Sequence, residues 1–258
     1  MKNKKRGNKT AQVTMFVIIA IVIVAIIVAV LVLNNKSGIQ KQQVSELEIK
    51  ARSDSAIASI LGCMKDISSD SLEYIGLQGG YYNIPNDSYN LNGTLIPYYY
   101  KDGKDLMPED SVIQKELGNY VNDGMDYCLN LTKASDVLLT YNKAQINVLI
   151  NENEVVFDLD MPISIQRNEK TETIELKNNP LYVKSKLFEM LEIAKYISDS
   201  NVKDNSSFCI SCIGAMANEQ NLSVDIISTQ ANKTNLIVIS QNISSDIHPA
   251  VFEFLNKY

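Results

Sequence analysis

The chain has 258 residues, of which 24 are basic and 30 are acidic, and its formal net charge is −6 at pH 7. This length is sufficient to bury a sizeable hydrophobic core. The sequence has no basic stripe with interleaved aromatic residues, which argues against nucleic acid as a partner, and the acidic balance favours solubility.

The first predicted element is a helix in an apolar run of 21 residues, from Val13 to Leu33, whose only polar side chain is Thr14. A helix of that length matches the ~30 Å hydrocarbon core of a bilayer. The run is longer than the apolar core of a secretory signal, and polar residues follow it in place of a small-x-small cleavage site. We therefore expect a transmembrane helix that the protein retains.

The charges on either side of the run predict its orientation. Glu46 and Glu48 lie among the bases after the run, whereas no acid lies among the bases before it, so the positive-inside bias places the N-terminus in the cytoplasm. Without the five bases before the run, the chain has 19 basic and 30 acidic residues. The five bases before the run are Lys2, Lys4, Lys5, Arg6 and Lys9.

The helix is expected to resume after the span, because apolar residues recur at mostly helical spacing from Val44 to Leu61. A rod from about residue 12 to residue 75 follows from this pattern. Residues 77–100 are rich in Gly, Pro, Asn and Tyr, which predicts a loop or short strands. The expected organisation is a cytoplasmic basic leader over 1–12, a transmembrane helix over 13–33, a helical stalk over 34–75 and an extracytoplasmic domain over 76–258.

The middle of that domain combines a helix with hairpins. Pro108 in a first helical turn, followed by two acids, predicts a helix whose apolar face reaches Cys128. Apolar and polar residues alternate over 144–150 and 155–165, and a further strand over 171–176 follows, which indicates antiparallel hairpins.

The last third predicts two further helices and three closing strands. Apolar residues recur at three and four positions from Val183 to Ile197, as in an amphipathic helix, and a shorter helix is expected from the CISC motif to about Gln220. Strands are expected at 222–228, 235–240 and 251–258. The predicted fold class is α+β, with antiparallel strands and two or three helices in the extracytoplasmic domain.

The four cysteines are consistent with an oxidising compartment and allow three pairings. We favour Cys63 with Cys128 and Cys209 with Cys212, since a long-range bridge would fasten the stalk to the domain. Each cysteine could instead be a small buried hydrophobe. A single CxxC lacks the four ligands of a structural zinc site, and no strand of the kind that opens a thioredoxin fold precedes it.

Asn-X-Ser/Thr sequons are more frequent beyond the apolar run than chance predicts, with eight present where composition alone gives roughly three. Occupied sequons mark surface loops of an exported protein, although an Asn-rich composition also produces sequons freely. The glycosylation candidates are Asn35, Asn86, Asn92, Asn130, Asn205, Asn221, Asn232 and Asn242.

No catalytic signature and no cofactor-binding or metal-binding motif emerges from the sequence. The only histidine, His248, has no motif around a serine or cysteine to pair with it, so a solvated loop histidine is the favoured interpretation. Asp158 and Asp160 project from one face of a predicted strand, where they could act as acid and base or bind a cation. The apolar residues on the opposite face of the strand favour a different interpretation, in which the two carboxylates lie on the solvent-exposed face of a sheet.

Two tyrosine clusters, GGYY and IPYYY, suggest a contact surface, because Tyr is enriched where proteins meet partners. Packing between the rod and the domain is the favoured alternative.

Four segments together carry a resemblance: AQVTMFVIIAIVIV, LEYIGLQGGYYNIP, IPYYYKDGKDLMPE and the closing VFEFLNKY. The chain resembles uncharacterised single-span cell-surface proteins of small-genome archaea. This resemblance implies a location and an architecture, with no assigned activity.

The N-terminus also resembles the leader of archaeal type IV pilins, in which a cut releases a mature chain that begins with the apolar helix. Cleavage after Ala11 would start the mature chain at Gln12, and cleavage after Gly7 would start it at Asn8. The family commonly carries Glu near the fifth mature position, where this sequence has Phe16 or Gln12.

Three hypotheses follow for the function. The first is a membrane-anchored surface protein whose acidic domain binds a partner, and the second is a pilin-like filament subunit that self-assembles. The third is an anchored redox or hydrolytic enzyme that uses the CISC pair or the acidic strand.

Overall fold

The computed structural model describes residues 9–91, 93–132, 138–141, 145–167, 170–176, 180–203, 209–229, 233–242 and 250–258. The chain divides into two compact units, Met1–Ser55 and Ala56–Tyr258. The second unit mixes helices with antiparallel and mixed sheets, so the α+β class is confirmed.

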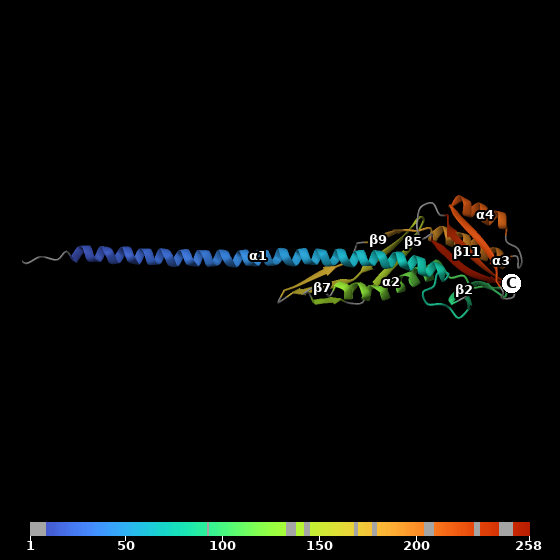
Figure 1. The fold of residues 1–258 in the computed structure, drawn as a ribbon, viewed down its shortest axis with the longest axis horizontal. Coiled ribbons are helices and arrows are strands. Elements are labelled where there is room, and N and C mark those ends of the chain that lie inside the picture. The colour runs from blue at the N-terminus through green and yellow to red at the C-terminus, as the bar shows by residue number, and fades with distance from the viewer. Residues whose placement is uncertain are drawn as a thin grey trace, which may run out of the picture. The chain divides into compact units, whose positions relative to one another are not determined.

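The elements follow one another along the chain as Figure 1 colours them. They are α1 (Lys9–Leu77), β1 (Ser88–Leu91), β2 (Thr94–Lys101), β3 (Lys104–Asp105), α2 (Asp110–Thr132), β4 (Leu138–Tyr141), β5 (Gln145–Asn151), β6 (Glu154–Asp160), β7 (Pro162–Arg167), β8 (Lys170–Glu175), β9 (Leu181–Lys184), α3 (Leu187–Lys203), α4 (Ile210–Glu219), β10 (Leu222–Ser228), β11 (Thr234–Gln241) and β12 (Val251–Lys257).

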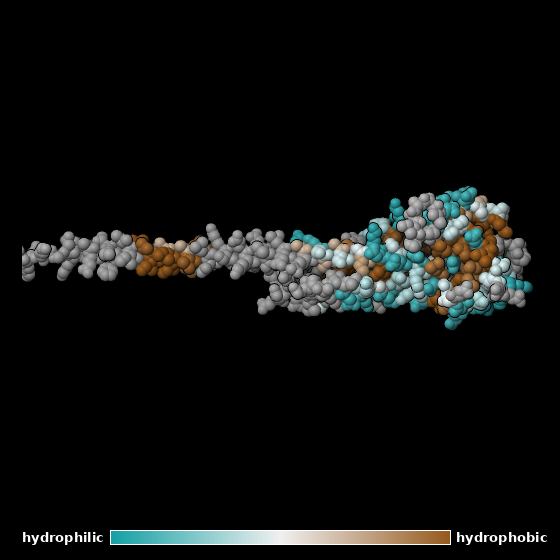
Figure 2. Space-filling model, viewed as in Figure 1, coloured by the Kyte–Doolittle hydropathy of each residue, from teal (hydrophilic) through white to brown (hydrophobic). Residues whose placement is uncertain are grey.

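In the first unit, the described side chains of residues 21–32 on α1 are all apolar and exposed, and Figure 2 shows them as a brown segment. Within the side chains that the structure describes, no helix holds a stretch both long and apolar enough to cross a bilayer. The expected span, Val13–Leu33, includes residues 13–20 and 33, whose side chains lie outside the described set.

In the second unit, the last part of α1 is a core helix. Ile60, Met64, Ser68, Ser71 and Ile75 are buried and recur every three or four residues, which places them on one face of the helix. The compact unit begins at Ala56, so the expected stalk over 34–75 extends across the boundary between the two units.

The largest sheet has the strand order β1-β2-β12-β11-β10, with β3 paired to β2. β12 lies between β2 and β11 and is parallel to β2 but antiparallel to β11. The predicted hairpins β5–β6 and β7–β8 are present, and the expected closing strands β10 and β11 also pair antiparallel. The predicted strand over 155–165 is divided at Met161, because β6 joins the sheet β5-β6-β9 and β7 joins β4-β7-β8.

Two predicted helix starts are wrong by a few residues. Pro108 precedes α2, and the Glu109 carbonyl accepts the first helical bonds from Val112 and Ile113. Val183, predicted in a helix, lies in β9, where it pairs with Val155 of β6. The next helix starts later because the Ser185 hydroxyl accepts from the Leu187 amide and caps α3.

The main core combines the end of α1 with α2, α3, α4 and the sheets. Tyr99 is fully buried, its ring stacks on Phe254 at 4.4 Å between centroids, and its hydroxyl donates to the Gly79 carbonyl at 3.0 Å. Tyr98 belongs to a smaller buried cluster with Ile96, Leu236 and Leu255. The tyrosines of the IPYYY segment are therefore packing residues.

Candidate functional site

Both disulfides have the pairing that the sequence analysis favoured. Cys63 on α1 is joined to Cys128 on α2, and Cys209 is joined to Cys212 at the start of α4. The first bridge connects two helices that run side by side in the second unit (Figure 1). The second bridge spans one turn, where the Cys209 sulfur also accepts from the Cys212 amide at 3.2 Å and caps α4.

The acidic strand does not bring a set of metal ligands together. Asp158 is exposed on β6 opposite Asn147, and Asp160 lies at the end of the same strand opposite Gln145. Among the residues that the structure describes, no group of three or more His, Cys, Asp or Glu side chains could hold a metal ion. His248 lies outside those residues.

The glycosylation candidates divide by location. Four of them are exposed on the second unit: Asn86, Asn130, Asn221 and Asn242. Asn35 lies in α1 with its side chain outside the described set, and Asn92, Asn205 and Asn232 lie outside the described residues altogether. The processing candidate Gly7 lies outside them too, while Ala11 and Gln12 belong to α1 with their side chains undescribed.

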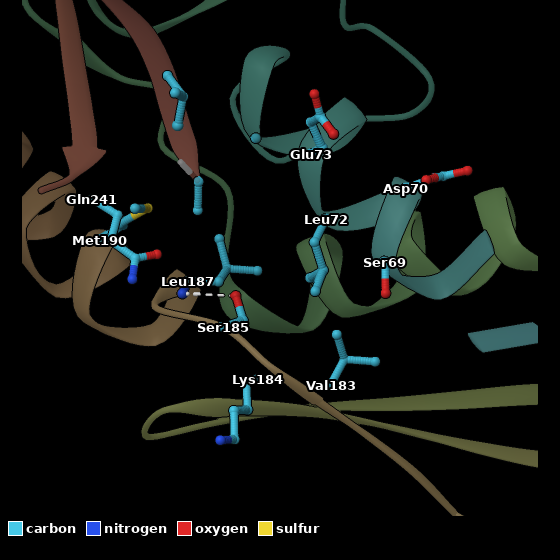
Figure 3. Close-up of a pocket in the computed structure, with 13 residues that line it drawn as sticks. Ser69, Asp70, Leu72, Glu73, Val183, Lys184, Ser185, Leu187, Met190 and Gln241 are labelled. Carbon is cyan, nitrogen blue, oxygen red and sulfur yellow. Dashed lines mark hydrogen bonds between the residues drawn. The ribbon is translucent and has the colours of Figure 1, made fainter. Parts of the chain in front are cut away.

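One pocket of about 270 Å³ lies between the end of α1, the β9–α3 connection and the strands β11 and β12 (Figure 3). Apolar side chains such as Leu72, Val183 and Leu187 line its centre. The charged ends of Asp70, Glu73 and Lys184 point away from one another. The pocket is therefore a packing hollow without converging acid–base groups.

A second pocket, of about 390 Å³, has tyrosines as three of its six lining residues, and we call it the tyrosine pocket. Its position is on α1 and α2, next to the loop that joins α1 to β1. The six residues that line it are Ile67, Tyr82, Tyr120, Asp123, Gly124 and Tyr127.

Three tyrosine rings contact one another at the tyrosine pocket. Tyr82 and Tyr120 meet edge to face, with 5.3 Å between ring centroids, and Tyr74 lies 5.2 Å from Tyr120 and 6.2 Å from Tyr82. Tyr127, one of the wall residues, has 65% of its surface exposed. The rings come from α1, from the following loop and from α2, so the fold assembles them from three segments.

A buried carboxylate fixes the loop that carries Tyr82. Glu116 on α2 accepts the backbone amides of Tyr82 at 3.0 Å and Asn83 at 2.6 Å, and also the Asn83 side-chain amide at 3.1 Å. The chain reaches this point through Gly79 and Gly80, whose positive φ angles of 55° and 86° suit glycine. These contacts fix the backbone from which the Tyr82 side chain projects.

The charges near the rings are negative. The Tyr82 hydroxyl donates to Asp123 at 3.1 Å, and this hydrogen bond is the main cause that raises the pKa of Tyr82. Partial burial raises the pKa of Tyr120, and the nearby carboxylates of Asp70 and Glu73 raise it further. The charged groups that act on these two hydroxyls are therefore all carboxylates.

The tyrosines around residue 82 form a visible cluster in the sequence, whereas nothing in the predicted elements linked them to Tyr74, Tyr120, Tyr127 and Asp123. One signal was available, because Tyr120 and Tyr127 are seven residues apart and so share a face of α2. Their meeting with α1 depends on tertiary packing.

Comparison of the chain with known protein families, curated proteins and solved structures finds no match.

Proposed function

We propose that the chain is a single-pass, membrane-anchored cell-surface protein whose acidic second unit is an interaction domain. The observation that carries this proposal is the continuous exposure of apolar side chains over residues 21–32 of α1, within an uncharged run of 21 residues. Each Val, Leu or Ile removed from water stabilises the buried state by about 1.5–3 kcal/mol. A bilayer supplies that burial, and the helix satisfies its own backbone groups.

The bases that precede the run would keep the leader in the cytoplasm, so the second unit would lie outside. The exposed sequons and the two disulfides support an exported location.

Alkaline carbonate extraction of cell membranes tests the anchor. The full chain is expected in the membrane pellet, whereas the double substitution Ile23→Lys and Ile27→Lys is expected to release it. The matched control is Ile227→Lys, at a half-exposed position on β10, which leaves the chain in the pellet. Extraction of the unaltered protein by carbonate contradicts the proposal. Protease added to intact cells should cleave the second unit and spare a tag placed before Lys2.

A filament subunit is the second candidate, and the length of α1 favours it. The helix continues over Lys9–Leu77, so an apolar first part could pack among identical helices once the leader is removed. Mass spectrometry of the native N-terminal peptide separates the two candidates. A start at Gln12 or Asn8 that is enriched in sheared surface material supports the filament, and an intact leader confined to membranes contradicts it.

A further inference from the structure

We propose that the tyrosine pocket binds an N-methylated ammonium group. This inference gives a ligand class to the interaction domain of the proposed function, and it does not depend on how the first unit is anchored.

The arrangement of rings is the first argument. A cation is attracted to the face of an aromatic ring when it lies within about 6 Å of the ring centroid. Tyr82 and Tyr120 lie 5.3 Å apart at centroid level and both line the pocket together with Tyr127. A group that enters the pocket therefore lies against at least two tyrosine rings, whose planes are 75° apart.

The charge of the walls is the second argument. Of the six residues that line the pocket, none is basic and one, Asp123, is an acid. Two further carboxylates, Asp70 and Glu73, lie near enough to act on the Tyr120 hydroxyl. An anion would be repelled here, and a neutral ligand would gain nothing from these charges, whereas a cation is attracted both by the carboxylates and by the rings.

The rigidity of the site is the third argument. The Glu116 carboxylate fixes the Tyr82 backbone, and the Cys63–Cys128 disulfide joins α1 to α2 one helical turn from Ile67 and Gly124. A site that is already ordered loses little entropy when it binds a ligand.

The composition of the walls selects methylated cations. A bare ammonium is compact and strongly hydrated, so it keeps its water and prefers hydrogen-bond acceptors. Methyl groups weaken that hydration and can contact Ile67 and the tyrosine rings. The pocket volume of about 390 Å³ accommodates a trimethylammonium group and the start of the chain that carries it.

The test is isothermal titration calorimetry of the full chain in nanodiscs made without choline lipids. The probes are choline, its neutral isostere 3,3-dimethyl-1-butanol, glucose, and a short peptide that contains Nε-trimethyllysine. Choline is expected to bind in the millimolar range or tighter, and the isostere at least tenfold more weakly. Stronger binding of the peptide than of choline assigns the group to a methylated protein side chain, and the reverse assigns it to a small solute.

Variants of the protein connect binding to the pocket. Tyr120→Leu removes one ring and is expected to weaken choline binding at least tenfold. Asp123→Asn keeps the shape of the wall, removes its charge, and should weaken binding severalfold even if Tyr120→Leu disturbs the fold. The matched control is Tyr182→Leu on β9, where the side chain is 59% exposed, and this variant is expected to bind choline normally.

Three results would overturn the inference: no choline binding up to about 100 mM, equal affinity for the isostere, or binding of glucose in place of choline. Binding that is unchanged in both pocket variants would also overturn it. None of these results affects carbonate extraction, so failure of this inference is distinguishable from failure of the anchor.

Discussion

Ile67 on α1 lies directly against Gly124 on α2, so closely that a Cβ atom added to Gly124 would be 2.7 Å from Ile67 Cγ2 and 3.0 Å from its Cδ1. Both residues line the tyrosine pocket. The close approach of the two helices, and with it the base of the pocket, depends on the missing side chain of one glycine.

The variant Gly124→Ala is therefore expected to destabilise the second unit. Alanine favours a helix over glycine by about 1 kcal/mol, but overpacking against a β-branched side chain costs about 1–3 kcal/mol. The matched control is Gly214→Ala on α4, where nothing lies within 4 Å of the added atom and a gain of up to about 1 kcal/mol is expected. Urea unfolding measures both changes, and equal effects of the two substitutions would contradict the close contact.

The two disulfides are expected to contribute unequally to stability. Cys63 and Cys128 are separated by 65 residues, and closing a loop of that length is worth about 4 kcal/mol on the chain-entropy model. Cys209 and Cys212 are separated by 3, for which the same model gives about 1.6 kcal/mol. Chemical unfolding of the two double-alanine variants tests this order. Identification of Cys63 and Cys128 as free thiols by non-reducing peptide mapping would exclude the longer bridge.

The variant Glu116→Ala is expected to free the loop that carries Tyr82. Three donors from Tyr82 and Asn83 lose their acceptor, and each buried donor without a partner costs about 1–3 kcal/mol unless water reaches it. Hydrogen exchange at the amides of Tyr82 and Asn83 should accelerate markedly. The control is Glu219→Ala at an exposed position of α4, which should leave exchange at these two amides unchanged.

Glu253 on β12 predicts a dependence of stability on pH. Burial raises the pKa of this carboxyl group above its ordinary value of 4.5. The folded state thus favours the protonated form of Glu253. This preference stabilises the fold fully below the pKa that Glu253 has in the unfolded chain, and the stabilisation is lost as the pH rises through the pKa that Glu253 has in the folded chain. Glu253→Gln imitates the protonated form, so the variant should have the higher Tm at pH 7.

The difference in Tm between Glu253→Gln and the unaltered chain should vanish by about pH 4. Glu219→Gln, at an exposed position, serves as the control and should show no such convergence. A Glu253→Gln variant that is less stable than the unaltered chain at pH 7 would contradict the burial of a charged carboxylate on β12.

Local patterns predicted the elements that alternate or repeat clearly, such as β5, β6 and α3 after Leu187. They did not predict β9, because Val183 continues the helical spacing of α3 while its backbone pairs with β6. Whether Val183 lies in a helix or in a strand depends on a partner strand nearly thirty residues earlier in the chain. The division at Met161 was missed for the same reason, since two different sheets receive the strands on either side of it.

The tyrosine pocket is harder still to predict from the sequence. Tyr74, Tyr82 and Tyr120 lie on three segments, and their meeting depends on the approach of Ile67 to Gly124 and on the hydrogen bonds of Glu116. Neither interaction has a signature in residue spacing. The disulfide between Cys63 and Cys128 was the one long-range contact that the sequence allowed us to propose, because cysteines pair with so few partners.

The position of β12 also sets the order of events during biosynthesis. Its residues, Val251–Lys257, fill the gap between β2 and β11, and pairing with β2 joins parts of the chain more than 150 residues apart. While the ribosome is still making the chain, β2 therefore has no central neighbour and exposes an unpaired edge. Closure of the sheet must wait until residue 257 has been translated, so it is a late, non-local step in the folding of this domain.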